Sequence, residues 1–289
     1  MAFSYQHEYH AGNHADVLKH ITISLILESL CKKDKPFTVI DSHCGAGRFN
    51  LSDERLLKTR EAESGIKRLI QKNINNTAIE KYIHLQTPYY SKGLYAGSAE
   101  LERLFLRKQD ALHLIEKHPA VLQSLKENIK LPLETSDGEK KAEGSIFIHE
   151  EDSYKALKAL TPPLIKRGLV LCAPSYEDAG DYKAVTETLS EVQKKWNTAI
   201  IALWYPLITR RKNETSKMLI TLEDNAKMSL TPRESFKVEL IIKNKDTMTE
   251  ENKCHLYGSG MFIINPPWQL KENLTECINV LKENLSETL

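Results

Sequence analysis

The order of apolar and polar positions along the chain predicts its fold class. Seven short apolar runs have the length and hydrophobicity of buried strands. They cover residues 37–40, 111–115, 145–148, 169–172, 199–203, 236–242 and 261–264. Amphipathic stretches of ten or more residues separate most of these runs, as at 181–196 and 216–225, and their patterns suit helices. Strands that alternate with helices predict an α/β fold with a seven-stranded, mostly parallel sheet covered on both faces.

The stretch before the first run predicts a helix. The side chain of Asn13 can cap the N–H of Asp16, three residues further on. An apolar stripe at helical spacing follows, formed by Val17, Leu18, Ile21 and Leu25. We expect this helix to end near Cys31, before the charged turn at 32–36.

Residues 48–97 interrupt the alternation of strands and helices. Polar, helix-prone stretches occur there at 54–58, 63–71 and 78–83, without a clear buried strand among them. We interpret the segment as a helical insertion subdomain after the first strand, within a single domain that spans residues 1–289. A plain surface excursion is the alternative, because closing a long insertion costs little free energy.

Composition places the chain among globular proteins without a strong overall charge. Its 289 residues are 41% hydrophobic and 27% charged, which is the balance of a soluble protein with an ample core. The 40 lysines and arginines are matched by 39 acids, so no overall basic field attracts nucleic acid. Any contact with RNA or DNA therefore requires a local patch.

The sequence also limits where the protein is expected to work. The apolar run 199–208 is ten residues long and includes Pro206, whereas a membrane helix needs about 20 apolar residues. The first twelve residues lack the apolar centre of a secretory signal. The five cysteines form no CxxC pair, which argues against a disulfide framework and suits a reducing compartment. We therefore expect a cytoplasmic protein without a membrane partner.

The first apolar run leads into a turn that suits a nucleotide site. Asp41 follows the run, and the turn containing Gly45 and Gly47 lets the backbone approach a nucleotide closely. The third glycine of the dinucleotide fingerprint is replaced by Asn50. Glu116 lies 69 positions after Gly47, and without the 50 residues of the proposed insertion the separation is 19. A ribose-binding acid is expected at a spacing of about 20.

A second acid completes the expected cofactor pocket. Asp152 ends the third run, where a side chain can hydrogen-bond an adenine amino group. In a doubly wound sheet the strands' carboxyl ends meet at one crevice, so Asp41, Glu116 and Asp152 should converge. This pattern predicts S-adenosylmethionine, with ribose at Glu116, adenine at Asp152 and the methionine end near Gly45. The nicotinamide cofactor of an oxidoreductase is the alternative, because it uses the same turn and Glu116.

The fourth run continues into a segment that resembles a site for amine methylation. Methyltransferases that act on adenine have an acid or asparagine, two prolines and an aromatic residue at this place. The side-chain oxygen and a proline carbonyl accept the hydrogens of the amine, and the aromatic ring stacks on the base. Pro174 and Tyr176 fit this pattern, but Ala173 and Ser175 replace the acid and the second proline.

The segment Asn265-Pro266-Pro267-Trp268 matches the same pattern of letters more closely. It follows the last apolar run, which we expect to form a late strand at an antiparallel edge of the sheet. We interpret the segment as a turn whose two prolines fix an extended exit, and a catalytic role for it is the alternative.

Histidines and one lysine crowd the first twenty residues. They are His7, His10, His14, His20 and Lys19, preceded by Tyr5. Their spacing, even with Asp16 included, matches no established metal pattern, so we expect no metal. Such a cluster suits stacking on a nucleotide and contact with its phosphates. We therefore predict Tyr5, His7 and Lys19 as contacts to RNA.

Residues 5–20 resemble the opening of the RlmJ-type 23S ribosomal RNA adenine-N6 methyltransferases. Residues 41–48, 95–98, 203–206 and 260–268 are similar to the same family. The resemblance implies a Rossmann-like, S-adenosylmethionine-dependent methyltransferase with a helical insertion. It also implies action on one adenine of the large-subunit RNA without further subunits, so we expect a monomer.

The resemblance further implies roles for individual residues. Those that match the family's contacts to the methyl donor are His20, His43, Ser98, Glu116, Asp152 and Ser153. The position of Tyr5 matches a contact to RNA. Ala173 stands where the family has the catalytic acid of an Asp-Pro-Pro-Tyr pattern. This departure leaves a second hypothesis, a protein that binds the donor and RNA but has lost or weak catalysis.

Overall fold

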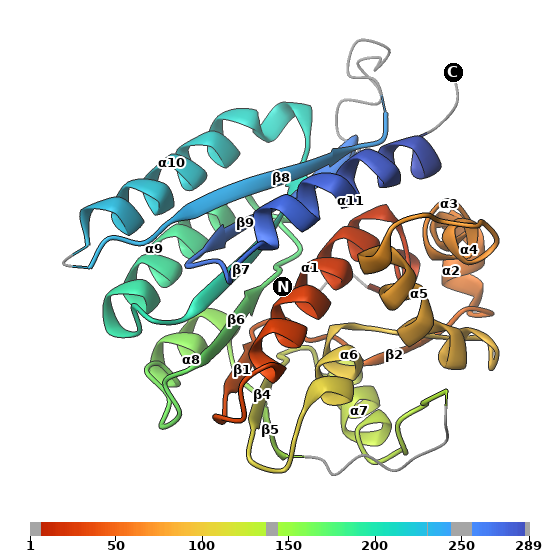
Figure 1. Cartoon of the computed structure of the whole chain (residues 1–289), viewed down its shortest axis with the longest axis horizontal. Coiled ribbons are helices and arrows are strands. Elements are labelled where there is room, and N and C mark those ends of the chain that lie inside the picture. Colours follow the sequence, from red (N-terminus) through yellow and green to blue (C-terminus); the bar gives the residue numbers. More distant parts are fainter. Residues whose placement is uncertain (1–6, 137–143, 230, 244–255, 287–289) are drawn as a thin grey trace.

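The computed structural model of the chain describes residues 7–136, 144–229, 231–243 and 256–286. Its centre is a seven-stranded sheet, so the seven predicted strands and the predicted α/β class are confirmed (Figure 1). Across the sheet the strands are β5 (Ser145–His149), β4 (Ala111–Ile115), β1 (Thr38–Asp41), β6 (Gly168–Cys172), β7 (Ile200–Leu207), β9 (Gly258–Ile264) and β8 (Ser235–Ile241). The first five of these are parallel, and β9 is antiparallel to both of its neighbours.

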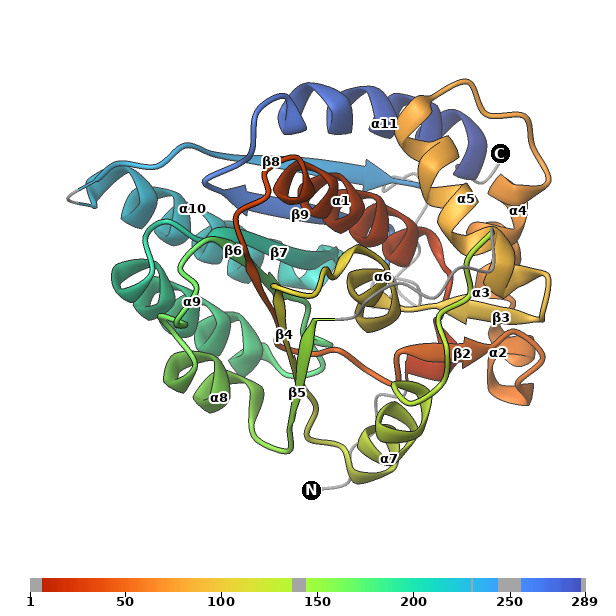
Figure 2. The same cartoon turned by 60° about the horizontal axis from the view of Figure 1, so that its bottom comes forward.

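Helices cover both faces of the sheet, as expected for strands that are buried on both sides (Figures 1 and 2). One face packs against α1 (His14–Cys31), α6 (Ser98–Phe105) and α11 (Leu270–Leu285). The other face packs against α8 (Ser153–Ala159), α9 (Ala179–Lys195) and α10 (Lys212–Met228). The helix α7 (Pro119–Asn128) lies between β4 and β5 in the chain. None of the described helices is both long and apolar enough to cross a membrane.

The predicted N-terminal helix is confirmed as α1. The side chain of Asn13 accepts hydrogen bonds from the N–H groups of Ala15 and Asp16 at 2.9 Å each, and the helix ends at Cys31. Most of its residues are buried, because α1 packs against α5, α6, α11 and the strand β9. This packing fixes the first turns of α1 relative to the sheet.

The segment after β1 contains the predicted helical stretches. They form α2 (Glu54–Thr59), α3 (Glu61–Ser64), α4 (Ile66–Ile70) and α5 (Thr77–Tyr90). Two short antiparallel strands, β2 (Arg48–Asn50) and β3 (Leu94–Ala96), bring the ends of the segment together. The chain therefore leaves the sheet after β1 and returns beside it at α6.

The prediction that the last strand lies at an edge is wrong. The strand β9 lies between β7 and β8, and all seven of its residues are buried. On this side of the sheet β8 is the edge strand, and it alternates buried with more exposed residues. Gly260 explains part of this packing, because a Cβ there would lie 2.2 Å from Cζ of Tyr205. The hydrophobicity of a strand does not show which strands pair with it, so the position of β9 in the sheet could not be predicted from its own residues.

The same topology separates Asn265 from the carboxyl ends of the parallel strands. Because β9 is antiparallel, Asn265 follows it at the end of the sheet where β7 begins. The amide of Asn265 donates hydrogen bonds to the carbonyls of Thr198 (2.9 Å) and Ala199 (3.3 Å). Trp268 is 88% exposed on that side of the molecule. This placement favours the interpretation of the Asn-Pro-Pro-Trp segment as a turn.

Candidate functional site

A cavity of about 740 Å³ lies at the carboxyl ends of the parallel strands. Residues that follow β1, β4, β5, β6 and β7 line it, together with the first turns of α1. This is the crevice in which open α/β sheets bind their ligands, and its volume is within the range of about 300–1,000 Å³ for ligand pockets.

The structure brings most of the predicted donor-binding residues to this cavity. Those on its wall are His20, His43, Gly45, Ser98, Glu116, Asp152 and Ser153. Gly47 is not on the wall: it is buried, and its carbonyl accepts a hydrogen bond from the N–H of Gly97 at 2.8 Å. We therefore assign Gly47 to the shape of the turn and not to direct contact with a ligand.

Asp41 also lies behind the wall, contrary to the expected convergence of three acids. It is fully buried, accepts a hydrogen bond from the Ser98 hydroxyl at 2.6 Å, and accepts another from the His43 N–H at 3.1 Å. Burial raises the pKa of Asp41 to about 6. Asp41 thus positions two residues of the wall, because β1 ends with this side chain pointing into the protein.

Glu116 is partly buried at the end of β4. Its carboxylate accepts a hydrogen bond from the N–H of His118 at 2.7 Å. Burial raises the pKa of Glu116, although the N–H groups of His118 and Gly45 oppose the rise. Glu116 lies on the cavity wall, where its carboxylate can accept a hydrogen bond from a ligand hydroxyl.

Asp152 begins the helix α8 at the end of β5. Its carboxylate accepts a hydrogen bond from the N–H of Lys155 at 3.3 Å and pairs with Nζ of Lys117 at 3.2 Å. Burial would raise the pKa of Asp152, but Lys117 and the helix N–H outweigh it, so this pKa is below its ordinary value. Asp152 is therefore an ionised acceptor on the cavity wall, with Ser153 beside it.

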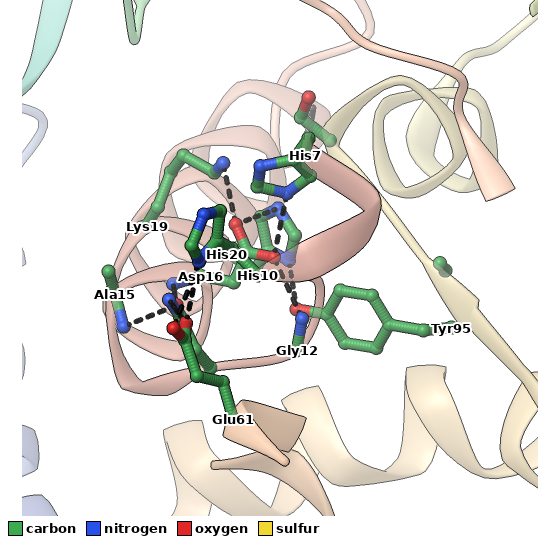
Figure 3. Close-up of polar contacts among 12 residues, drawn as sticks. His7, His10, Gly12, Ala15, Asp16, Lys19, His20, Glu61 and Tyr95 are labelled. Atoms are coloured by element: carbon green, nitrogen blue, oxygen red, sulfur yellow. Dashed lines mark hydrogen bonds and ion pairs between the residues drawn. The ribbon is translucent and has the colours of Figure 1, made fainter. Parts of the chain in front are cut away.

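The N-terminal cluster is centred on Asp16, whose side chain is only 2% exposed (Figure 3). Its carboxylate accepts hydrogen bonds from Nε2 of His7 at 3.0 Å, the N–H of Gly12 at 2.9 Å and Nζ of Lys19 at 2.7 Å. His7 and Lys19, the two described residues that we predicted as contacts to RNA, both lie on the cavity wall. The predicted RNA contact Tyr5 lies outside the described residues.

The remaining histidines of this cluster have protein partners. His10 pairs with Glu61 of α3 at 3.0 Å, and Asn13 donates a hydrogen bond to the same carboxylate at 2.8 Å. His20 shares a hydrogen bond of 2.7 Å with the Tyr95 hydroxyl, and burial lowers the pKa of His20 to about 3. Within the described ranges, no three histidine, cysteine, aspartate or glutamate side chains group as a metal site would require.

The Asp16 cluster predicts a pH-dependent contribution to stability. Burial opposes the ionisation of Asp16, but the interactions of its carboxylate with His7 and Lys19 outweigh this effect and keep the pKa of Asp16 well below its ordinary value. The ionised carboxylate therefore stabilises the fold above about pH 4, and this contribution is lost as the pH falls through the folded-state pKa. Asp16→Asn should lower the free energy of unfolding by about 3–5 kcal/mol at pH 7.

Urea unfolding of both proteins at pH 7 and in acid measures this difference, which should shrink below about pH 4. The matched control is Glu63→Gln, because Glu63 is an exposed acid of the neighbouring helix α3. Equal stabilities of the Asp16 variant and the unaltered chain at pH 7 would contradict the expectation.

The loop after β6 forms another part of the cavity. Ala173, Pro174 and Ser175 line it, but Tyr176 does not. The Tyr176 ring is 4% exposed, and its hydroxyl donates a hydrogen bond to the carbonyl of Trp204 at 3.1 Å. We had expected this ring to stack on the base, but in this structure it is buried and is not on the cavity wall. The ring is instead held in the core by contacts with Tyr182 and Met218, at a residue whose backbone is left-handed with φ at 53°.

Sequence reasoning missed several residues that line this cavity. Trp204 lies on β7, and Asp181 and Tyr154 lie on α9 and α8. The Tyr154 hydroxyl donates a hydrogen bond to Asp181 at 3.0 Å, and the Tyr154 ring contacts His43 edge-on. Their strand or helix position predicts no ligand contact, so only the assembled fold shows that they share a wall.

Comparison with known proteins agrees with this architecture. Residues 34–289 match the family model described as "Ribosomal RNA large subunit methyltransferase D, RlmJ". The chain belongs to the RlmJ family. It is similar to the protein named ribosomal RNA large subunit methyltransferase J in Escherichia coli, with 37% identity over 98% of this chain and 94% of that protein. The protein of the same name in Haemophilus influenzae is 35% identical, over the same shares of both chains.

A solved structure extends the RlmJ-family comparison. A Legionella pneumophila protein of the DUF519 family is similar to this chain with a TM-score of 0.79 and 28% identity. The similarity covers 96% of this chain and 94% of that protein. The fold of this chain is therefore similar over nearly its whole length to an experimentally solved structure.

The cavity wall fits S-adenosylmethionine, the methyl donor expected of an RlmJ-family enzyme. Gly45 has φ at 63° and presents only backbone to the cavity, so a nucleoside can approach it closely. Glu116 and Asp152 supply acceptor oxygens at the ends of neighbouring strands. Burial lowers the pKa of His43 to about 4, so both His20 and His43 are uncharged at neutral pH and do not repel a cationic donor.

Proposed function

We propose that this chain transfers a methyl group from S-adenosylmethionine to the N6 amine of an adenine in 23S ribosomal RNA. The observation that carries the proposal is the single cavity whose wall contains Gly45, Glu116 and Asp152 together with the loop that begins at Ala173. A donor held by the first three residues would lie next to the loop where amino-methyltransferases orient their substrate amine. S-adenosylmethionine supplies a methyl group bound to a positively charged sulfur.

Different residues of the cavity wall are proposed to bind different parts of the donor. In this proposal the Glu116 carboxylate accepts hydrogen bonds from ribose hydroxyls, and Asp152 accepts one from the adenine amine. His20, His43, Ser98 and Ser153 complete the pocket, with Gly45 and Gly47 shaping its turn. Asp41 positions Ser98 and His43 through the hydrogen bonds described above.

The RNA is proposed to approach across the N-terminal cluster. Tyr5 and His7 would stack on or hydrogen-bond the nucleotide, and Lys19 would attract its phosphate. We further propose that residues 1–289 act as one cytoplasmic monomeric domain, with residues 48–97 as an insertion subdomain. Pro174 supplies a carbonyl that accepts a hydrogen bond from the target amine.

Ala173 supports a second candidate function. Its methyl group accepts no hydrogen bond, so nothing at this position orients the lone pair of the amine or stabilises the charge that develops on it. The remaining cavity residues can still bind the donor and a nucleotide. The alternative is therefore a protein that binds S-adenosylmethionine and RNA with lost or weak catalysis.

Transfer of labelled methyl groups to protein-free 23S ribosomal RNA tests the proposal. After nuclease digestion of the RNA, we expect the label in N6-methyladenosine in the reaction with the unaltered chain or in the reaction with Ala173→Asp. Calorimetry with S-adenosylhomocysteine is the accompanying control for donor binding. No transfer by either protein despite donor binding would contradict the proposed reaction. Transfer by the aspartate variant alone would select the alternative function for the unaltered chain.

A further inference from the structure

One end of the cavity is apolar and is not used by the proposed donor residues. Three of its wall residues, Trp204, Pro206 and Ile208, are two positions apart on and just after β7, so they share one face of the extended chain. Pro174 and Ile242 line the cavity beside them. The charged residues Glu116 and Asp152 lie at the ends of β4 and β5, on the other side of β1 and β6. The cavity wall also contains the charged residues Glu177, Asp181 and Lys243, and we call the part around Trp204, Pro206 and Ile208 its apolar end.

Trp204 lies alongside the position where the amine-orienting acid is expected. The parallel register of β6 and β7 pairs Cys172 with Leu203, and the next residues on the two strands are Ala173 and Trp204. A planar base that rests on the indole therefore has its edge next to Ala173 and Pro174. The donor end of the cavity lies beyond these two residues.

The indole of Trp204 is free to take this role, whereas the ring of Tyr176 is not. The two ring centroids are 6.0 Å apart with an angle of 53°, and only Trp204 is on the cavity wall. Tyr176 is held in the core by its hydrogen bond to the Trp204 carbonyl and by contact with Met218. Among the described residues, the indole N–H of Trp204 has no hydrogen-bond partner, so packing alone holds the indole.

We infer that the target adenine stacks on Trp204 in the apolar end of the cavity, and that Tyr176 is a positioning residue that holds the backbone of Trp204. The inference rests on the proposed function, because it concerns the base that receives the methyl group. Stacking on an aromatic face, with proline and isoleucine side chains around it, is the means by which enzymes hold a base removed from its helix.

Tryptophan fluorescence with adenosine monophosphate as the probe tests this inference. Saturating S-adenosylhomocysteine first fills the donor end, so that the nucleotide can bind only elsewhere. We expect adenosine monophosphate to change the emission of the unaltered chain and of Trp268→Phe, but not that of Trp204→Phe. Trp268 is the matched control, because it is exposed and lies outside this cavity. Trp204→Ala should weaken nucleotide binding by about 5- to 150-fold, the range given by loss of one base–aromatic stack.

The outcomes separate this inference from the proposed function. If Trp204→Ala binds the nucleotide within about two-fold of the unaltered chain, or if Trp204→Phe keeps the emission change, the inference is wrong. Circular dichroism and binding of S-adenosylhomocysteine check that Trp204→Ala is folded. If it is not folded, the emission of Trp204→Phe, which keeps an aromatic ring at this position, still tests the inference. Failure of the unaltered chain to bind S-adenosylhomocysteine would instead overturn the proposed function.

Discussion

Replacement of Ala173 by aspartate should raise the rate of methyl transfer to 23S ribosomal RNA by about 10²- to 10³-fold, the effect of one preorganised catalytic group. The new carboxylate would accept a hydrogen from the target amine and direct its lone pair to the methyl group, while the Pro174 carbonyl accepts the other hydrogen. Ala173 lies on the cavity wall at the end of β6, so the larger side chain enters the cavity and not the core. Single-turnover transfer of labelled methyl groups measures the change.

Two variants serve as controls for this prediction. Ala173→Asn supplies an acceptor oxygen without a charge and should give an intermediate rate. Ser175→Pro restores the other departure from the family pattern, but Ser175 supplies no hydrogen-bond acceptor to the proposed mechanism, so its effect should be small. An unaltered chain that already transfers methyl groups as fast as Ala173→Asp would show that another group performs the role of the acid.

Replacement of Glu116 by glutamine should weaken the binding of S-adenosylhomocysteine by about 10- to 150-fold. This range corresponds to the loss of a hydrogen bond to a charged group, about 1.5–3 kcal/mol. The substitution keeps the size of the side chain and an oxygen that can accept from the N–H of His118. It removes the negative charge and leaves one oxygen fewer for ribose hydroxyls. Isothermal titration calorimetry measures the affinity.

Glu150→Gln is the matched control, because Glu150 follows the neighbouring strand β5 but lies outside the cavity. The side chain of Glu150 is 63% exposed and pairs with Lys126 at the surface. Its replacement should leave the affinity unchanged. Equal losses of affinity in the two variants would indicate a general effect of charge and not a ribose contact at Glu116.

Much of the fold follows from local patterns in the sequence. Most strands of the central sheet are buried enough to appear as apolar runs, although β5 at one edge is partly exposed. Asn13 marks the start of α1 because an N-cap is a local feature. Glu116 and Asp152 could be placed in one cavity because parallel strands present their carboxyl ends at the same edge. The positions of these two acids after predicted strands are therefore enough to predict that they share the cavity.

The features that the sequence did not predict depend on contacts between distant residues. The interior position of β9 is set by its pairing with both β7 and β8. The burial of Tyr176 depends on a left-handed backbone and on Met218, which is 42 residues away. Trp204 reaches the cavity because β7 pairs with β6 in one register. None of these contacts leaves a periodic signal in the chain.

The contacts between the N-terminus and the helices after β1 have a consequence for experiments that exchange parts between relatives. Thr59 donates a hydrogen bond to the carbonyl of Tyr9, Glu61 pairs with His10, and the N–H of Ile66 donates to the carbonyl of Gly12 at 2.8 Å. A chimera that receives foreign residues 48–97 alone would lose the matching surface for its own first residues. The two segments therefore form one exchangeable unit, and a graft that alters substrate choice has to carry both of them together.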